Sequence, residues 1–145
     1  MAASTVLDEL CAYLVAFTPT LSLKVAPTAG FNLFAGRMFD LPDAAVALIE
    51  TPGAPPEYDL GKPIQIEHPR VQFLVRGIPD DYAGPRLWAE QIKAALDEIR
   101  NSSQSGVRYL NIDILQPPFQ LKRDEKERVV ICFNVAPWKA PSPTS

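Results

Sequence analysis

The chain contains one histidine, which opens the stretch HPRVQFLVRG at His68. A histidine can act as a general base, and in a catalytic triad Asp80 or Asp81 would orient it while Cys132 served as the nucleophile. Each of these roles requires hydrogen-bond reach in the folded protein. Cys132 stands in an apolar run, where a thiol is usually inert packing. We therefore expect no catalytic triad and treat His68 as incidental.

The sequence also lacks the patterns of a metal or phosphate site. Cys11 and Cys132 lie far apart and, with a single histidine, do not have the spacing of zinc ligands. Two cysteines in apolar surroundings do not form a disulfide framework either. The glycines of GIPDDYAG fit neither phosphate-binding loop pattern, so we interpret this stretch as a turn with helix-capping acids. We expect no cofactor and no metal.

The composition is typical of one folded domain. The 145 residues are 47% hydrophobic and 21% charged, and a chain of this length builds a single core. The formal charge of -3 argues against a protein that grips nucleic acid, because such proteins concentrate lysine and arginine. No apolar run reaches the roughly 20 residues of a membrane span, and acids occupy the place of a signal peptide's basic residues. We expect synthesis in the cytosol and no membrane partner.

Helical periodicity occurs in two segments. In residues 5–17 apolar side chains recur at three- and four-residue intervals, and Ser4 or Thr5 can cap the helix. A second helix is predicted for residues 85–101, and NSSQSG closes it. Both segments carry one apolar stripe, which predicts that each helix packs one side against a core.

Strands are predicted where apolar and polar residues alternate or form a short apolar run. The predicted strands are Leu21–Val25, Ala44–Glu50, Arg70–Arg76, Val107–Leu115 and Arg128–Ala136. In the third, Val71, Phe73 and Val75 share one face, opposite Arg70 and Arg76. The third strand therefore has one buried face and one mainly polar face.

The fourth predicted strand alternates in the same way. Leu110, Ile112 and Ile114 alternate with a polar set that includes Tyr109. Residues 31–42 are aromatic but interrupted by glycine, and their pattern assigns no element.

Two polar connections link the predicted elements. Thr51–Pro63 holds four prolines and two glycines, which predicts a long exposed loop. LKRDEKER, residues 121–128, mixes both charge signs and predicts a solvated hairpin turn. Mixed charge grips nucleic acid poorly but can pair with an oppositely patterned surface on a neighbouring subunit.

The order of elements predicts an α+β fold. Because the two helices do not follow every strand, the sheet is expected to be mixed or mainly antiparallel, with both helices on one face. Residues 1–136 form this single domain. Residues 137–145 are expected to be a flexible proline-rich tail, since they offer too little apolar surface to offset the entropy of ordering.

Four stretches of the chain together match the pattern of a known family. They are NLFAGRMFDLPDAAVALIETPGAPPEYDL, HPRVQFLVRG with the Trp- and Ala-bearing helix after it, YLNIDILQPPF, and RDEKERVVICFNV. Over residues 31–136 the chain resembles the tail-terminator or minor capsid proteins that join head to tail in the neck of long-tailed bacteriophages. The best-matching residues are Arg76, Gly77, Asp124, Glu125, Arg128 and Asn134.

The resemblance implies a structural virion protein without a catalytic site. Such proteins assemble as a homo-oligomeric ring, commonly of six copies, on the end of the tail tube. The ring stops tube growth and meets the head-completion proteins, and DNA passes through its lumen without specific binding. An acidic chain agrees with this, because a basic lumen would hold DNA through counterion release. Assembly would take place in the host cytoplasm.

Under this interpretation the charged residues of two stretches are expected at subunit or partner interfaces. They are Arg70, Arg76, Asp80, Asp81, Arg123, Asp124, Glu125 and Arg128, with Pro55, Pro56 and Tyr58 in an interface loop. Charge reversal of Arg76 or Asp124 is then expected to leave a folded monomer that fails to assemble.

A second interpretation comes from a different functional class. The chain could be a cytosolic enzyme or a small-ligand-binding domain, with a pocket between the sheet and the second helix near Trp88. Mutational damage would then concentrate at His68 or Cys132 rather than at the charged loops.

Overall fold

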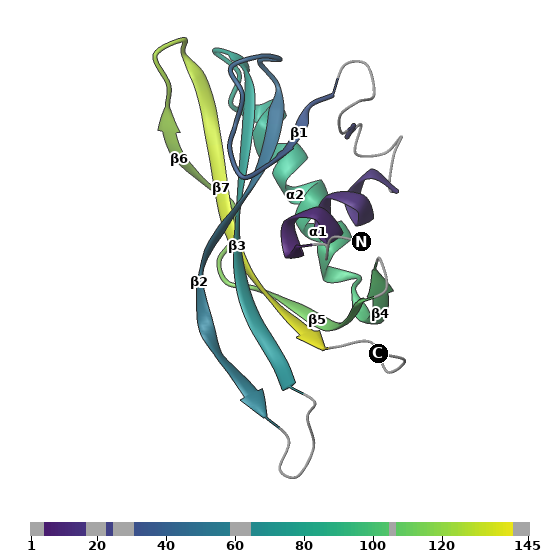
Figure 1. Ribbon diagram of the computed structural model, residues 1–145. Coiled ribbons are helices and arrows are strands. Elements are labelled where there is room, and N and C mark those ends of the chain that lie inside the picture. The colour runs from purple at the N-terminus through teal and green to yellow at the C-terminus, as the bar shows by residue number, and fades with distance from the viewer. Residues whose placement is uncertain (1–4, 17–22, 25–30, 59–64, 105–106, 141–145) are drawn as a thin grey trace.

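The computed structural model describes residues 5–16, 23–24, 31–58, 65–104 and 107–140, with the backbone alone for 54–58, 65, 101–104 and 107. In this part of the chain two helices pack on one mixed sheet (Figure 1). The helices are α1 (Val6–Val15) and α2 (Ala83–Asp97). The strands are β1 (Leu33–Ala35), β2 (Ala45–Tyr58), β3 (Gln65–Pro79), β4 (Arg100–Gln104), β5 (Val107–Ile114), β6 (Phe119–Arg123) and β7 (Arg128–Ala140). The predicted α+β class is confirmed.

Strand β7 lies at the centre of the sheet. On one side it pairs antiparallel with β3 along nearly its whole length. On its other side β6 pairs with its first half and β5 with its second half. The sheet continues from β3 through β2 to β1, and from β5 to β4, which gives the order β1-β2-β3-β7-β5-β4. Only the β1–β2 pair is parallel among the described strand pairs.

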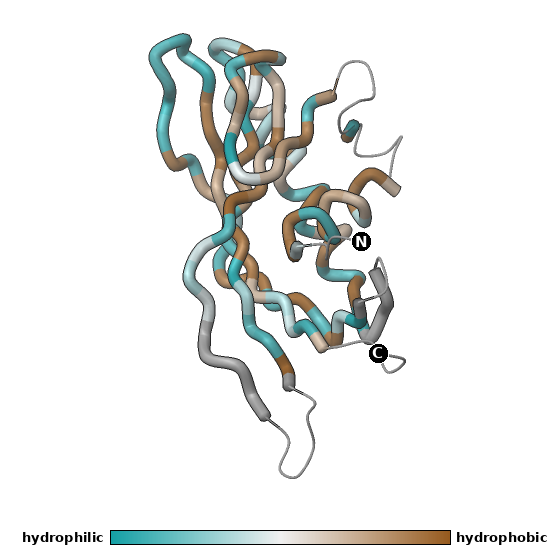
Figure 2. The backbone as a smooth tube through the Cα atoms, viewed as in Figure 1, coloured by the Kyte–Doolittle hydropathy of each residue, from teal (hydrophilic) through white to brown (hydrophobic). Residues whose placement is uncertain are grey.

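The main core lies between the helices and the inner face of the sheet. Both helices lie on this face (Figure 1), and hydrophobic residues line the crossing of strands and helices (Figure 2). Val71, Phe73 and Val75 are fully buried here, as the alternation in β3 predicts. The rings of Phe73 and its cross-strand partner Phe133 stack with centroids 4.9 Å apart.

Local capping fixes where each helix begins. At the start of α1 the backbone N–H of Asp8 donates to the Thr5 hydroxyl, and the Asp8 carboxylate accepts from the Thr5 N–H. This reciprocal pair satisfies two N–H groups that a helix end leaves free. Before α2, the Asp81 carboxylate accepts from the N–H of Gly84 at 3.0 Å. The predicted N-cap at Thr5 and the capping acid before the second helix are both confirmed.

A buried carboxylate anchors α1 to the sheet. Glu9 is fully buried. It accepts a hydrogen bond from the Tyr109 hydroxyl of β5 and forms an ion pair at 3.2 Å with Lys139 of β7. Burial, together with the neighbouring Glu9 charge, raises the pKa of Tyr109, so the phenol stays a donor. Because a buried charge is costly without such partners, this set holds α1 in one position over β5 and β7.

The face assignment predicted for β5 is wrong at Tyr109. This side chain was placed with the polar set but is fully buried, as is Ile112 on the same strand. The register against β7 shifts between Tyr109 and Asn111, which leaves Leu110 as an extra residue. Such a bulge reverses the alternation of a strand, so side chains three residues apart face the same core.

The loop predicted from Thr51 is wrong as far as residue 58. Strand β2 runs on to Tyr58 and pairs with β3 through two register shifts. Pro52, Pro55 and Pro56 fall in this stretch, where β2 has β3 on one side and no further described strand on the other. Proline is tolerated on such an edge because its missing N–H breaks no ladder hydrogen bond. Residues 59–63 of the predicted loop lie outside the described part.

The flexible tail predicted for residues 137–145 is not found at its first four positions. Strand β7 continues to Ala140, and residues 137–140 pair with β5, so the prediction is wrong for these four positions. Their pairing satisfies the backbone groups, and Trp138 Nε1–H donates to the Asp113 carboxylate at 2.8 Å. Residues 141–145 lie outside the described part of the chain.

Three shorter segments also differ from the sequence pattern. Residues 100–104, expected to close the second helix, form β4 against β5. The unassigned aromatic stretch contains β1. In the strand predicted at Leu21–Val25, Leu23 and Lys24 are not in a strand, and the other three residues are not described.

Lys139→Met tests the anchor of α1. Removing the ammonium leaves the Glu9 carboxylate buried beside Tyr109 without its ion pair, so we expect a loss of about 3 kcal/mol in the free energy of unfolding. Urea denaturation measures this loss. Lys93→Met is the matched control, because Lys93 makes an exposed 3.7 Å ion pair with Glu90, and a change below about 0.5 kcal/mol is expected. Equal effects of the two changes would contradict the anchoring role.

Candidate functional site

The residues of the hypothetical catalytic triad do not meet. His68 and Asp80 lie twelve residues apart along and just beyond β3, which corresponds to about 40 Å at roughly 3.3 Å per residue. Cys132 pairs with Leu74, between these two ends. The His68 ring instead makes an edge contact with Trp138, with centroids 4.9 Å apart.

The thiols and the α2 interface offer no reactive centre. Burial raises the pKa of Cys11 to about 12 and also raises the pKa of Cys132. The described residues contain no cluster of His, Cys, Asp and Glu that could hold a metal ion.

Between α2 and the sheet, Ala89, Ile92 and Leu96 are fully buried in the core, and Trp88 packs against it. The space in which the second interpretation placed its pocket is therefore filled.

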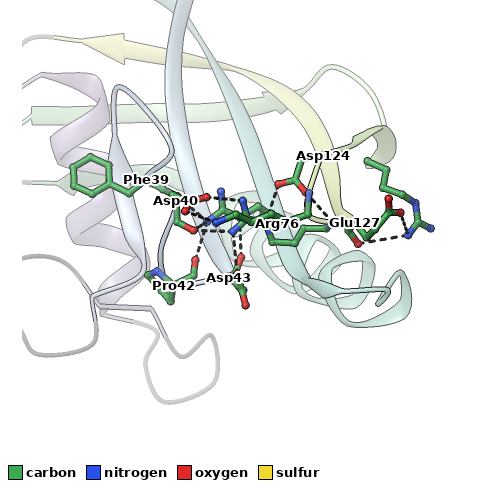
Figure 3. A network of polar contacts seen from close by, with 10 residues as sticks. Phe39, Asp40, Pro42, Asp43, Arg76, Asp124 and Glu127 are labelled. Carbon is green, nitrogen blue, oxygen red and sulfur yellow. Dashed lines mark hydrogen bonds and ion pairs between the residues drawn. The ribbon is translucent and has the colours of Figure 1, made fainter.

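Arg76, one of the two arginines of the opening motif, holds a loop against the outer face of the sheet. Its side chain is only 5% exposed. Nε donates to Asp43 O at 2.8 Å (Figure 3). Nη2 donates to the carbonyl oxygens of Phe39, Asp40 and Pro42 at 2.7, 3.1 and 2.8 Å. One guanidinium thus fixes residues 36–44, which we call the covering loop.

Arg128 ties the same loop to the β6–β7 turn. It is 3% exposed, and its Nε donates to Asp124 Oδ2 at 2.8 Å. Its two Nη atoms reach Asp40 Oδ1 at 2.9 Å and Asp43 Oδ1 at 3.0 Å. Lys126 adds a 2.5 Å ion pair to Asp40. We call Arg76, Arg128, Asp40, Asp43 and Asp124 the arginine clamp.

The charges of the clamp support one another. Burial lowers the pKa of Arg76, and the adjacent Arg128 adds to this, while the three aspartates oppose it. Hydrogen bonds from Lys126 and Arg128 lower the pKa of Asp40. For Asp124 partial burial opposes ionisation, but hydrogen bonds from Arg128 and Lys126 lower its pKa overall. The carboxylates of Asp40 and Asp124 are thus held ionised beside two buried guanidinium groups.

An apolar cluster seals the underside of the covering loop. Phe34, Ala45 and Ala47 are buried on the outer face, with Met38 packed against them. Phe39 stacks on Phe34 with centroids 4.5 Å apart. The outer face is therefore covered at this end by a loop that uses both polar and apolar contacts.

The Arg76–Gly77 pair has a structural explanation. Arg76 binds the covering loop on the outer side. A Cβ on Gly77 would lie 2.7 Å from Pro85 Cγ, so the absence of a side chain lets the first turn of α2 pack closely on β3. Arg76 thus holds the covering loop on the outer face, and Gly77 lets α2 pack closely on the inner face.

The remaining predicted interface residues fall into different environments. Asp80 makes a 3.4 Å ion pair with Arg123, which also reaches Glu127, and Asp81 caps α2. Arg70 and Glu125 are exposed, and neither side chain makes a hydrogen bond or ion pair to another described residue. Pro55, Pro56 and Tyr58 lie in β2 rather than in a loop, and their side chains are not described.

Sequence reasoning missed Asp40 and Asp43, which complete the clamp. Both flank Pro42 in the stretch without periodicity, where the backbone follows neither helix nor strand. The available signal was chemical: two acids near a strand face that carries an arginine. Pairing them correctly required knowing that β2, β3 and β7 are neighbours.

Comparison with known proteins decides the family. Residues 13–136 match the family described as bacteriophage tail terminator protein, which covers most of the chain. The chain belongs to the bacteriophage tail terminator family. Membership makes it a structural protein of the phage tail and implies, indirectly, a role without catalysis.

A solved structure shares the tail terminator's fold. It is a chain from the "Virion of native gene transfer agent (GTA) particle", with a TM-score of 0.66 and 15% identity, covering 93% of this chain and 94% of that chain. At this identity the likeness shows the fold alone. A comparison with curated proteins gives no match. Neither described helix of the tail terminator is long and apolar enough to cross a membrane.

The clamp changes what charge reversal at Arg76 or Asp124 should do. Both were expected to act only in assembly, but Arg76 is buried and Asp124 binds buried Arg128 within the same chain. Reversing either charge places like charges together in a desolvated site. In this tail terminator such changes therefore damage the monomer itself and do not test assembly.

Arg76→Met tests the hold on the covering loop. Four carbonyl oxygens lose their donor, and we expect the free energy of unfolding to fall by about 3 kcal/mol. Arg70→Met is the matched control on the same strand face, with an expected change below about 0.5 kcal/mol because Arg70 is exposed. Chemical denaturation of both variants checks this. A loss no larger than that of the control would exclude the clamp as a major contribution.

Acid should weaken the clamp. The pKa values of Asp40 and Asp124 are lowered in the folded chain, so their contribution to stability is present above the unfolded value near 4 and is lost as the pH falls through the lower folded values. Asp124→Asn should be less stable at pH 7 and lose less stability between about pH 4 and 2. Urea midpoints across this range measure the slope. Parallel curves for the variant and the wild type would refute the assignment.

Proposed function

We propose that this tail terminator forms a closed ring of identical copies on the end of the tail tube. There it stops tube growth and joins the tube to the head-completion proteins, and DNA passes through the lumen. The observation that carries the proposal is the family match over residues 13–136, which runs from α1 to β7 and includes the whole arginine clamp.

Exposed apolar side chains support a role in assembly. Leu41, Ile78, Tyr82, Leu87 and Leu121 are each 45–68% exposed. They belong to the covering loop, the end of β3, the start of α2 and β6, which all lie near the same end of the sheet. Apolar surface that gathers at one end favours contact with other proteins. We propose that this end meets a partner in the neck or tail.

The clamp supports the proposal through preorganisation. The covering loop presents Leu41, which is 68% exposed, from a backbone that Arg76 holds through four hydrogen bonds. A loop that is already ordered loses less entropy when a partner docks on it. The acidic composition, with a formal charge of -3, agrees with DNA passing through without being held.

Tail length and copy number test the proposed function. In a phage whose gene for this chain is disrupted, tubes should extend beyond their normal length, because nothing stops the addition of tube subunits. In wild-type particles, quantitative mass spectrometry should find the chain at a fixed copy number near one ring per tail. Complementation with the wild-type gene is the control and should restore normal tails. Tubes of normal length without the chain would overturn the proposal.

A further inference from the structure

The charged residues expected at an interface divide clearly once their partners are known. Six of the eight are engaged within the chain: Arg76, Asp124 and Arg128 in the clamp, Asp80 with Arg123, and Asp81 as a helix cap. Of this set, only the side chains of Arg70 and Glu125 make neither a hydrogen bond nor an ion pair with the described residues. They carry opposite charges and are both exposed. Each is available to a partner outside the chain.

Arg70 lies in a groove on the open part of the outer face. The groove has a volume of about 480 Å³ and a mixed lining, with Thr51, Gln72, Gln116 and Asn134 as polar residues and Pro52 and Leu115 as apolar ones. It spans β2, β3, β7 and the connection after β5, beyond the reach of the covering loop. The buried oxygen Oε1 of Gln116 has no hydrogen-bond partner among the described residues. The groove thus offers a guanidinium and several amide groups, which suit a carboxylate and the backbone of a turn.

Glu125 lies on a turn whose backbone conformation is fixed by hydrogen bonds. The N–H of Asp124 donates to Arg128 O at 2.9 Å, and the N–H of Glu127 donates to Asp124 O at 3.0 Å. Lys126 on the same turn is tied to Asp40. The β6–β7 turn lies at one end of the sheet and is hydrophilic (Figure 2). A rigid turn with a free carboxylate is a suitable ligand for a groove that contains a free guanidinium.

The turn and the groove of one chain are too far apart to meet. Arg70 is nine residues along β3 from Pro79, which pairs with Arg128 at the base of the turn. Nine residues of strand correspond to about 30 Å. A contact between Arg70 and Glu125 therefore joins two copies.

We infer that the β6–β7 turn of one copy docks in the Arg70 groove of the next, with Glu125 paired to Arg70. The contact uses different surfaces on the two copies, and repetition of such a head-to-tail contact closes into a ring when the rotation allows it. The inference rests on the proposed function, because it supplies the contact between neighbours in the ring.

A charge swap tests the pair. Arg70→Glu and Glu125→Arg should each raise the dissociation constant between copies by at least about tenfold, because each places like charges together. The double variant restores opposite charges and should recover most of the wild-type affinity. Analytical ultracentrifugation and native mass spectrometry of the full chain measure assembly. Single losses without recovery in the double variant would overturn the inference.

Two controls separate assembly from folding. Arg100→Glu reverses an exposed arginine at the start of β4, whose carboxylate partner Asp97 ends α2 of the same chain, and it should leave assembly unchanged. Urea midpoints of all variants should match the wild type, since the side chains of Arg70 and Glu125 are exposed and make no hydrogen bond or ion pair with the described residues. Loss of assembly in Arg100→Glu as well would show a general charge effect and would count against the specific pair.

Disulfide cross-linking tests the same contact between copies independently, and it can also be applied to assembled tails. The double variant Arg70→Cys, Glu125→Cys should form disulfides only between copies, because a disulfide requires Cα atoms within about 7 Å. Native Cys11 and Cys132 are buried and provide a low background. Under oxidation a ladder of multimers that ends at one closed size is expected. Monomers alone from assembled tails would overturn the inferred contact while leaving the proposed function in place, whereas absence of the chain from tails would remove the function itself.

Discussion

The outer half of the structure depends on the burial of two guanidinium groups, Arg76 and Arg128. A planar group with five donors can satisfy several carbonyl and carboxylate oxygens at once, which suits a loop that has no regular hydrogen bonding of its own. Here Arg76 takes the backbone oxygens of the covering loop, and Arg128 takes the carboxylates. Because β3 and β7 are neighbouring strands, and Arg76 pairs with Val130 close to Arg128, the two groups act on the same loop. The loop, the turn and the sheet are thereby fixed as one unit.

This arrangement divides the outer face of the sheet into two regions. At the end near the β6–β7 turn, the covering loop shields Phe34, Ala45 and Ala47 from water. Toward the other end the face stays open, and it carries polar side chains such as Arg70 and Gln72 beside apolar ones such as Leu115. The inner face needs no such division because α1 and α2 cover it. A single sheet therefore supplies a core on one side, and both a supported loop and an accessible groove on the other.

Periodicity predicted the parts of the fold that repeat and failed where the chain departs from a repeat. The helices and the central strands were predictable because apolar spacing reports one buried face, as in Val71, Phe73 and Val75. The bulge at Leu110 was not predictable. One extra residue reverses which side chains of the strand face the core, and the alternation in the sequence does not show where that residue is inserted. The prolines of β2 predicted a loop, but they lie in a strand at the edge of the sheet, where proline is tolerated. At the site, Arg76 and Arg128 were recognised from the sequence as candidate residues. Their burial was not predicted, because it depends on Asp40 and Asp43, which lie in a stretch without periodicity.

The edge of the sheet also bears on how copies can meet. Strand β6 is exposed along its length, and on the side away from β7 no described strand pairs with it, so this edge is open to a strand of another chain. A register shift between Gln120 and Lys122, followed by Arg123, makes this edge irregular and charged, which are features that oppose strand addition. Side-chain contacts at the turn and the groove are then a better basis for assembly than a continuous sheet. Such contacts fix the orientation of neighbours through charge and shape, and they leave each domain's own sheet closed to uncontrolled growth.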